Sequence, residues 1–424
     1  MASVRPNVVL IGTLDSKGEE YGWAQRWLKE AGAEVTLIDF GILTNPSIVP
    51  DICAADVAEM GGARINELQI AREGSDTRAR GLAVMTEGLR VILDDLHQEG
   101  RLQAVFGMGG SGGSSVISAA MRALPVGVPK LLVSTMASGD VATYVRESDL
   151  TIMHSVTDIL GMNVISRAVI GNACGAVLGM ADAYLKRQST EANLAKAVGI
   201  TMFGVTTPCV KRITEVLGGH DTETVVFHAV GSGGRAMEKL VEQGLLDGVI
   251  DVTTSELVDG EYGGKFAAGP ERLRAAISAR IPYVVVPGAM EVLNFTSVDA
   301  IPEPFGPPDR DPIIHNTSVC AVRTNAEEAK HLGWLMGERL RGGRDRVVVV
   351  VPLKGFSSYS KLPDGPWVDP EADKEFVNAL KMNLDDDIDL VEVDANINDR
   401  EFADAVVETY LELCDRVSTV GKGA

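Results

Sequence analysis

The sequence predicts an α/β protein built from two Rossmann-like, doubly wound lobes with mainly parallel sheets. Short apolar runs recur along the chain and are continuous rather than alternating, which is typical of strands covered on both faces. Segments with helical spacing follow these runs, and glycine-rich turns join the two. The pattern begins again after a polar stretch at residues 187–193. We therefore expect an N-terminal lobe over residues 1–188 and a C-terminal lobe over residues 194–424.

Composition narrows the class of protein. The chain has 424 residues, 45% of them hydrophobic, which is enough for a large core. Its formal net charge is −20, which disfavours binding to nucleic acid or to anionic membranes by bulk electrostatics. A nucleotide is not excluded, because it needs only a local positive site.

Cysteine usage and hydropathy indicate a cytoplasmic protein. The five cysteines are scattered, so neither a disulfide framework nor a zinc site is predicted. No basic-apolar-cleavage pattern opens the chain, and no apolar run reaches about 18 residues, the length of a membrane span. We expect no membrane partner and no dedicated metal site.

The predicted strands fall into two series. Between the second and third strands, residues 61–80 carry many charges and glycines and are expected to form an irregular flap. A proline-rich loop is expected around residues 302–312 in the second series. The strands are predicted at 7–12, 35–41, 104–108, 130–135 and 150–154, and then at 197–204, 224–230, 248–256, 283–286, 347–351 and 388–393.

A glycine-rich loop is the strongest motif, and it stands between a predicted strand and a predicted helix. Its backbone N–H groups, together with those of the first helical turn, are suited to an anion. It lacks the P-loop pattern, and its GxGxxG match (Gly107, Gly109, Gly112) is weak by itself. We interpret it as a phosphate loop; a close-packed turn that needs small residues is the alternative. The candidate ligand-binding residues are Gly109, Gly110, Ser111, Gly112, Gly113 and Ser114.

Two acidic residues in the first lobe are candidates for contacts with a nucleotide. Asp39 ends the second strand, about where an acid binds ribose in dinucleotide folds. Asp15 is a candidate partner of a Mg²⁺ ion that accompanies the phosphates. For both residues the alternative is that the carboxylate caps a turn.

A second hypothesis makes Ser111 a nucleophile. The loop matches G-x-S-x-G, the nucleophile elbow of serine hydrolases. Such an enzyme needs a histidine base, and His154, His228 and His315 are available. Glycine at both variable positions is unusual for an elbow.

A second constellation lies in the C-terminal lobe. The glycines Gly231, Gly233 and Gly234 repeat the strand–GSGG–helix unit, which suggests a weak internal repeat and a second anion site. Ligands of open α/β sheets bind where strands end. A Glu/His acid–base pair from Glu256 with His228 or His315 is the plausible chemistry, with satisfied polar groups as the alternative. The candidate ligand contacts are Arg235, Thr253 and Thr254, and Asp251 lies in the same group.

With both loops placed, the sequence resembles the Tm-1-like ATP-binding family (UPF0261). The resemblance runs over nearly the whole chain. It is carried by GMGGSGGS at residues 107–114, ITMFGVTTPCV at residues 200–210 and FHAVGSGGRAME at residues 227–238.

The resemblance implies two Rossmann-like lobes, ATP binding and a homodimer. It implies that the first glycine loop holds the triphosphate, with Thr13, Ser134, Thr135 and Ser138 nearby on neighbouring strand ends. We expect an unidentified small metabolite on the second lobe, in or beside the cleft between lobes. Whether the protein is an ATP-using enzyme or a nucleotide-sensing protein without turnover stays open at this point.

Overall fold

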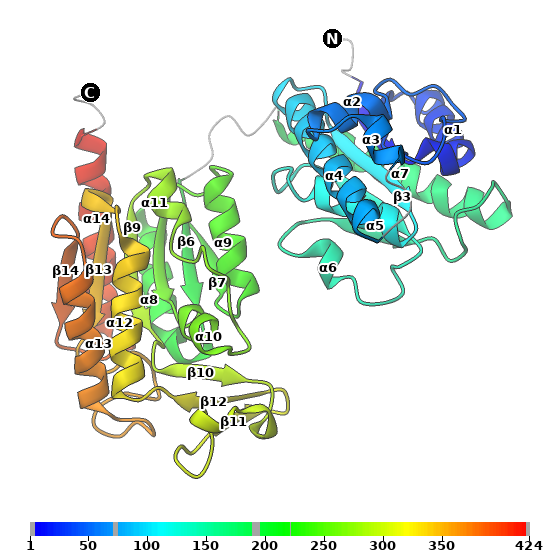
Figure 1. The fold of residues 1–424 in the computed structure, drawn as a ribbon. Helices are drawn as coiled ribbons and strands as arrows, with labels where there is room; N and C mark the ends of the chain where they lie inside the picture. The colour runs from blue at the N-terminus through cyan, green and yellow to red at the C-terminus, as the bar shows by residue number, and fades with distance from the viewer. Residues whose placement is uncertain (1–4, 71–74, 189–195, 221, 421–424) are drawn as a thin grey trace. The chain divides into compact units, whose positions relative to one another are not determined.

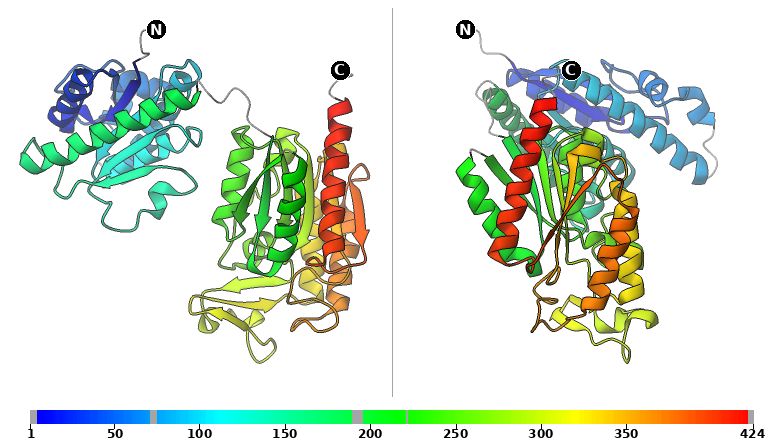
Figure 2. Two further views of the ribbon diagram at one scale, coloured as in Figure 1. Left: turned by 180° about the vertical axis from the view of Figure 1, so that it is seen from behind. Right: turned by 90° about the vertical axis from the view of Figure 1, so that its left-hand side faces the viewer.

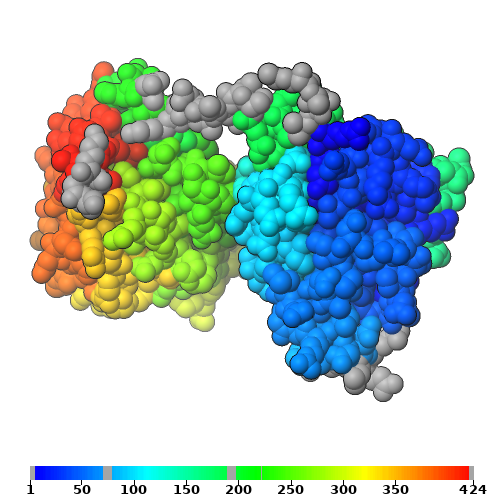
Figure 3. Space-filling view, turned by 90° about the horizontal axis from the view of Figure 1, so that it is seen from above, coloured from blue at the N-terminus to red at the C-terminus, as the bar shows by residue number. Residues whose placement is uncertain are grey.

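The computed structural model describes residues 5–70, 75–188, 196–220 and 222–420. It divides into two compact units, Met1–Asn193 (unit one) and Leu194–Ala424 (unit two) (Figure 1). In the surface view, unit one is blue to blue-green and unit two is green to red (Figure 3). Of the polar stretch at residues 187–193, where the boundary between the lobes is predicted, residues 189–193 lie outside the described residues.

Unit one contains a five-stranded parallel sheet. Every recorded strand pair in it is parallel. The strand order is β2-β1-β3-β4-β5. The strands are β1 (Asn7–Gly12), β2 (Glu34–Asp39), β3 (Ala104–Gly109), β4 (Lys130–Ser134) and β5 (Thr151–His154).

Helices cover both faces of this sheet. On one face, α1 (Leu14–Glu30) and α7 (Val164–Gln188) bury their apolar residues against it, and α7 runs across the strands (Figure 2). The other face is covered by α2 (Ala54–Met60), α3 (Ile65–Ile70), α4 (Ser75–Gln98) and α5 (Ser111–Met121), and α6 (Ala142–Val145) follows β4.

The flap predicted over residues 61–80 is largely helical. It contains α3 and the start of α4, and Leu68 of α3 packs into the core. The expectation of irregular structure was therefore wrong for the described part; residues 71–74 lie outside it. In α3 the apolar residues that pack on the core, Ile65 and Leu68, stand among polar residues, so the local pattern did not indicate a helix.

One helix within the described ranges, α7, is long and apolar enough to cross a membrane by length and composition. Part of α7 belongs to the core of unit one. The residues that it buries there include Ile170, Ala173, Cys174, Val177 and Ala181.

Unit two contains a six-stranded parallel sheet, which confirms the predicted α/β class with mainly parallel sheets. The strand order is β14-β13-β9-β8-β6-β7. The strands are β6 (Lys196–Met202), β7 (Thr222–His228), β8 (Gly248–Thr253), β9 (Tyr283–Gly288), β13 (Val347–Pro352) and β14 (Asp389–Val393).

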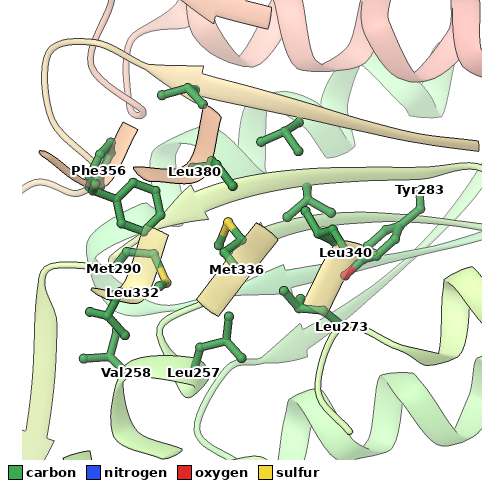
Figure 4. Packing of buried hydrophobic residues seen from close by; sticks show 14 of the residues in the cluster. Leu257, Val258, Leu273, Tyr283, Met290, Leu332, Met336, Leu340, Phe356 and Leu380 are labelled. Carbon is green, nitrogen blue, oxygen red and sulfur yellow. The ribbon is translucent and has the colours of Figure 1, made fainter. Parts of the chain in front are cut away.

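Helices again cover both faces. One face packs against α8 (Thr207–Leu217) and α14 (Arg400–Val420). On the opposite face, Met336 and its neighbours on α12 meet Tyr283, Met290 and Leu380 in the core (Figure 4). The helices there are α9 (Ser232–Glu242), α10 (Glu256–Tyr262), α11 (Ala275–Ala279), α12 (Ala326–Leu340) and α13 (Pro370–Asn383).

A small antiparallel sheet follows β9, where the sequence analysis expects only a proline-rich loop. It consists of β10 (Val292–Phe295), β12 (Val319–Arg323) and β11 (Ile313–Asn316), in that order. The prolines occupy the connection between β10 and β11, so the loop exists, but its flanking strands were missed. The small sheet lies beyond the carboxyl ends of the parallel strands (Figure 1).

The two parallel sheets have the same strand order, but their glycine loops follow different strands. In each sheet the first strand lies between the second and the third, as β1 between β2 and β3 and β6 between β7 and β8. The glycine loop follows the third strand (β3) in unit one and the second strand (β7) in unit two. The predicted internal repeat therefore holds for strand order, and the two loops are not equivalent.

Candidate functional site

The carboxyl ends of β1 and β3 form the switch point of unit one. These strands are neighbours, yet the helices that follow them, α1 and α5, pack on opposite faces of the sheet. Open α/β sheets bind ligands at such a point. The first glycine loop follows β3 and therefore lies at this switch point, a position that suits a phosphate-binding loop.

Tyr21 of α1 separates the ends of β1 and β3. Its buried hydroxyl accepts the N–H of Met108 at 2.6 Å and lies 2.6 Å from the carbonyl oxygen of Ile11, to which it donates. The pairing of the two strands ends just before this contact, at Ile11 opposite Gly107. A Cβ at Gly12 would lie 2.1 Å from the Tyr21 ring, so glycine there makes room for it. Sequence reasoning missed Tyr21.

The first turn of α5 offers unoccupied amides. Gly110 is the N-cap and has no side-chain cap, and the first turn contains no acidic residue. The Ser114 N–H donates to the carbonyl of Gly110 at 2.8 Å. Across the ranges that the structure describes, the amides of Ser111, Gly112 and Gly113 have no protein acceptor. Orphan amides and the positive end of a helix favour an anion here.

Two glycines of this loop have different reasons to be glycine. A Cβ at Gly109 would lie 3.0 Å from the backbone of Gly113 and Ser114, so Gly109 is needed for the loop to close. A Cβ at Gly113 would meet nothing within 4 Å, and one at Gly110 only Thr135 at 3.9 Å. Packing inside the protein therefore does not require glycine at position 113.

The hydroxyls of Ser114 and Ser134 hold the loop together. Both residues are fully buried, and their oxygen atoms are 2.7 Å apart. Ser134 also accepts the N–H of Met136 at 3.0 Å. These contacts lie inside the protein, and a role of the two hydroxyls in phosphate binding stays a prediction. Thr135 and the exposed Ser138 lie at the same edge of the sheet.

Asp39 and Asp15 bind the chain's own amides. Asp39 is buried, and its carboxylate accepts the N–H groups of Leu14 at 3.0 Å and Gly41 at 2.9 Å. Burial raises the pKa of Asp39 above its usual range. Asp15 accepts the N–H of Leu43 at 2.8 Å. Both carboxylates therefore cap turns. The buried Oδ1 of Asp15 has no partner among the described residues, and the ribose and Mg²⁺ roles stay predictions.

Thr13 and Ser111 remain at the open edge. Thr13 is half-buried at the start of α1, and its hydroxyl lies 2.9 Å from that of Ser16. Ser111 is exposed. Within the described residues it has no hydrogen bond to a histidine, so the nucleophile hypothesis gains no assembled base.

The second glycine loop is occupied by Glu256. Its carboxylate accepts the N–H groups of Gly231 at 2.6 Å and Gly234 at 3.1 Å. A Cβ at Gly234 would lie 1.9 Å from this carboxylate, and one at Gly233 would lie 1.9 Å from the carbonyl of His228. The glycines thus leave room for the carboxylate of Glu256. Because Glu256 already accepts these amides, the loop is not an open site for a second anion. Glu256 holds the loop and does not have the acid–base role expected for it.

Arg272 neutralises Glu256 inside the protein. Its Nε donates to Glu256 at 2.7 Å, and its two Nη atoms donate to Asp251 at 2.5 and 2.8 Å. Glu238 lies 3.3 Å away, and Tyr283 donates to Asp251 at 2.9 Å. Burial opposes the charge on Arg272, but the carboxylates of Asp251 and Glu256 raise its pKa. Sequence reasoning missed Arg272.

Three further candidates of unit two have structural partners. Thr253 and Thr254 are fully buried, and the Thr253 hydroxyl lies 2.7 Å from that of Thr206. The Thr254 hydroxyl donates to the carbonyl of Val286 at 3.0 Å. Arg235 is exposed and donates to the carbonyl of Ala267 at 3.0 Å. Neither threonine is accessible to a ligand.

His228 and His315 do come together, around a cavity of about 160 Å³. It opens at the ends of β6 and β7 and is bounded by the small antiparallel sheet. Glu256 does not line it. The lining residues are Phe203, Gly204, Val205, His228, Val230, Phe266, Val292, Asn294, His315, Asn316, Val319, Ala321 and Tyr359.

Among the described residues, no group of three or more His, Cys, Asp or Glu side chains is arranged to hold a metal ion.

The fold defines an α/β protein of two units with parallel sheets, and comparisons with known proteins give its family. The descriptions "Uncharacterised protein family (UPF0261) N-terminal domain" and "C-terminal domain" match residues 6–186 and 195–414. The chain belongs to this family, which confirms the resemblance predicted from its sequence.

Relatives cover most of the chain. A UPF0261 protein of Clostridium tetani (strain Massachusetts / E88) is 38% identical over 410 residues, 96% of this chain and 99% of that protein. The ToMV resistance protein Tm-1(GCR237) of Solanum lycopersicum is 39% identical over 343 residues, 80% of this chain and 45% of that protein. Among solved structures, MurG of Acinetobacter baumannii spans 97% of this chain and 95% of its own at 11% identity and a TM-score of 0.24, too low to carry an argument.

Proposed function

We propose that this protein binds ATP and that the loop from Gly109 to Ser114 of unit one holds the nucleotide phosphates. The observation that supports the proposal is the set of unoccupied amides of Ser111, Gly112 and Gly113 at the switch point. Backbone N–H groups at a helix N-terminus are the donors that phosphate groups use in many nucleotide sites.

The comparison with unit two strengthens this assignment. The amides at the start of α9 carry a carboxylate of the chain itself, Glu256. Among the described residues, no carboxylate accepts the amides of Ser111, Gly112 and Gly113 at the start of α5. An anion bound at these amides would therefore come from outside the chain.

Mg²⁺ would accompany the phosphates. The amides of Leu43 and Thr44 bind Oδ2 of Asp15, whereas its buried Oδ1 has no partner among the described residues, so phosphate oxygens, water and this Oδ1 are the candidate ligands of the ion. The hydroxyls of Thr13 and Thr135 lie at the same sheet edge and are candidates to hydrogen-bond the phosphates or this water.

The second part of the proposal concerns unit two, whose cavity takes a small metabolite beside His228 and His315. We further propose a cytoplasmic homodimer. Either an ATP-using enzyme or a nucleotide sensor fits these two sites, and incubation with ATP and pooled metabolites separates them by the release of ADP or AMP.

Titration calorimetry with ATP, ADP and adenosine in the presence of Mg²⁺ tests the phosphate assignment. The loop predicts heat with ATP, weaker binding of ADP and none detectable with adenosine at millimolar concentration. Equal affinity for adenosine and ATP would contradict the assignment, because the phosphates would then contribute nothing.

A further inference from the structure

The cavity of unit two is small and built from segments far apart in the sequence. Its volume of about 160 Å³ corresponds to about five water molecules. Sites for drug-sized ligands usually start at about 300 Å³. The occupant is therefore a single ring or a fused pair of rings.

The walls favour a flat, uncharged ligand. Phe203 and Phe266 lie with their ring centres 6.0 Å apart, and Tyr359 contributes a third ring. No lysine or arginine is among the cavity-lining residues of the described chain. Aromatic walls without a counter-charge suit an aromatic ring and disfavour a phosphate or carboxylate.

His228 presents a hydrogen-bond acceptor to this cavity. Its Nδ1 lies 3.2 Å from the carbonyl oxygen of Met202. A carbonyl oxygen can only accept, so Nδ1 carries the hydrogen in the neutral ring. The lone pair is then on Nε2.

Asn294 presents a second acceptor. Its side chain is 2% exposed, and its Nδ2 donates to Asp259 at 3.0 Å. When Asp259 is ionised its carboxylate can only accept, so in that state Nδ2 faces Asp259 and Oδ1 is the other end of the amide. In the part of the chain that is described, the Asn294 Oδ1 has no protein donor, and the residue lines the cavity.

Asp259 is the positioning residue for this wall. It also accepts the backbone N–H groups of Asn294 at 2.7 Å and Phe266 at 3.0 Å. One carboxylate thus orients the amide acceptor and an aromatic wall.

The position of His315 points to a built site. It falls at the irregular step between Ile314 and Asn316, where the pairing of β11 with β12 shifts register. Such bulges re-aim side chains next to binding sites.

We propose that this cavity binds one planar aromatic ring system that carries its own N–H or O–H donors, with Asn294 Oδ1 and His228 Nε2 as acceptors. The inference rests on the second part of the proposed function and gives the ligand a chemical class. It is independent of ATP binding by unit one.

Matched probes test the proposal on the full chain. Uracil, adenine and resorcinol are planar and carry donors; 1,3-dimethyluracil and 1,3-dimethoxybenzene keep the rings but lose the donors. Ligand-observed NMR and titration calorimetry should detect at least one of the first three, with its donor-free partner at least about tenfold weaker where the pair is matched. Binding by none of the first three, or equal binding of a matched pair, would overturn the proposal. Comparing the affinities of uracil and adenine with that of resorcinol shows whether the cavity prefers nitrogen heterocycles or phenols.

Variants place the binding in this cavity. His228→Phe keeps an aromatic ring on an exposed residue and removes the acceptor, so the donor-bearing probe should bind about tenfold more weakly. His331→Phe makes the same change on α12, outside the cavity, and should leave probe binding unchanged. Unchanged probe binding by His228→Phe would contradict the assignment. ATP affinity, measured on the same variants, should not move, so failure here is separable from failure of the nucleotide proposal.

Discussion

The carboxylate of Glu256 accepts the backbone N–H of Gly231 at 2.6 Å, inside a loop whose sequence is that of an anion site. The same carboxylate accepts a hydrogen bond from Nε of Arg272 at 2.7 Å. The loop therefore closes on an anion that the chain itself supplies. In the comparable loop of unit one, no carboxylate of the described residues accepts the amides of Ser111, Gly112 and Gly113.

Replacing Glu256 by glutamine should destabilise the protein. The neutral amide loses the ion pair with Arg272, which keeps Asp251 as its partner, and the glutamine side chain has one oxygen to accept from Gly231, Gly234 and Arg272. Because Asp251 still balances Arg272, the expected loss is that of buried hydrogen bonds to a charged group, about 1.5–3 kcal/mol. Urea denaturation of the full chain measures the loss, with Glu261→Gln on the exposed side of α10 as control. A change below about 1 kcal/mol would show that Glu256 does not hold the loop.

Tyr21→Phe should lower stability by about 1–3 kcal/mol, because the N–H of Met108 loses its acceptor in a buried place. The ring, and thus the packing against Gly12, is kept. Tyr144→Phe, on the half-buried α6, is the matched control and should change little. Thermal unfolding of the two variants compares them, and equal melting temperatures would contradict the role assigned to the hydroxyl.

Stability should fall as pH rises from 5 to 8. Burial raises the pKa of Asp259 to about 7 and that of Asp373 to about 6. An acid with a higher pKa in the folded protein binds more protons there than in the unfolded chain. The free energy of unfolding therefore decreases with pH across the interval between the two pKa values.

Asp259 alone accounts for at most about 3 kcal/mol of the loss between pH 5 and 8. Urea midpoints at pH 5, 6, 7 and 8 test the prediction, and Asp259→Asn should flatten the profile. A profile that is unchanged by the substitution would show that Asp259 does not titrate in this interval.

Two glycine substitutions in the first loop should act differently. Gly109→Ala places a Cβ 3.0 Å from the backbone of the next turn and should destabilise unit one. Gly113→Ala meets nothing within 4 Å, so the fold should persist while ATP binding weakens about tenfold or more. Gly179→Ala on α7, which also meets nothing within 4 Å, is the control. Full ATP binding by Gly113→Ala would argue against phosphate at this turn.

The sequence predicts the parallel sheets well because each strand is a continuous apolar run, such as residues 347–351. It misses β10, β11 and β12, which are four or five residues long and owe their stability to one another and to the core. Local pattern cannot reveal pairing across a proline-rich connection.

The site is only partly predictable for a related reason. The sequence marks His228 and His315, and the fold brings both to one cavity. It also marks two similar glycine loops, but only the three-dimensional position of Glu256 distinguishes the closed loop from the open one. Asn294 is a polar residue within the apolar run Val292–Phe295, which could have marked it as a candidate. Its partner Asp259 is 35 residues away, so the contact between them could not be predicted from the sequence.

The central claim is that backbone amides at the start of α5 bind the phosphates of ATP, and a pair of substitutions at Ser111 tests it most directly. Ser111 is the first helical residue, where proline is well tolerated, and Gly110 before it has extended backbone angles of −78° and −165° that suit a residue preceding proline. Ser111→Pro removes one N–H donor and keeps the helix, whereas Ser111→Ala removes only the hydroxyl. In titration calorimetry with ATP and Mg²⁺, Ser111→Ala should bind like the unaltered protein and Ser111→Pro about tenfold more weakly. Equal affinity of the proline variant and the unaltered protein would contradict the claim.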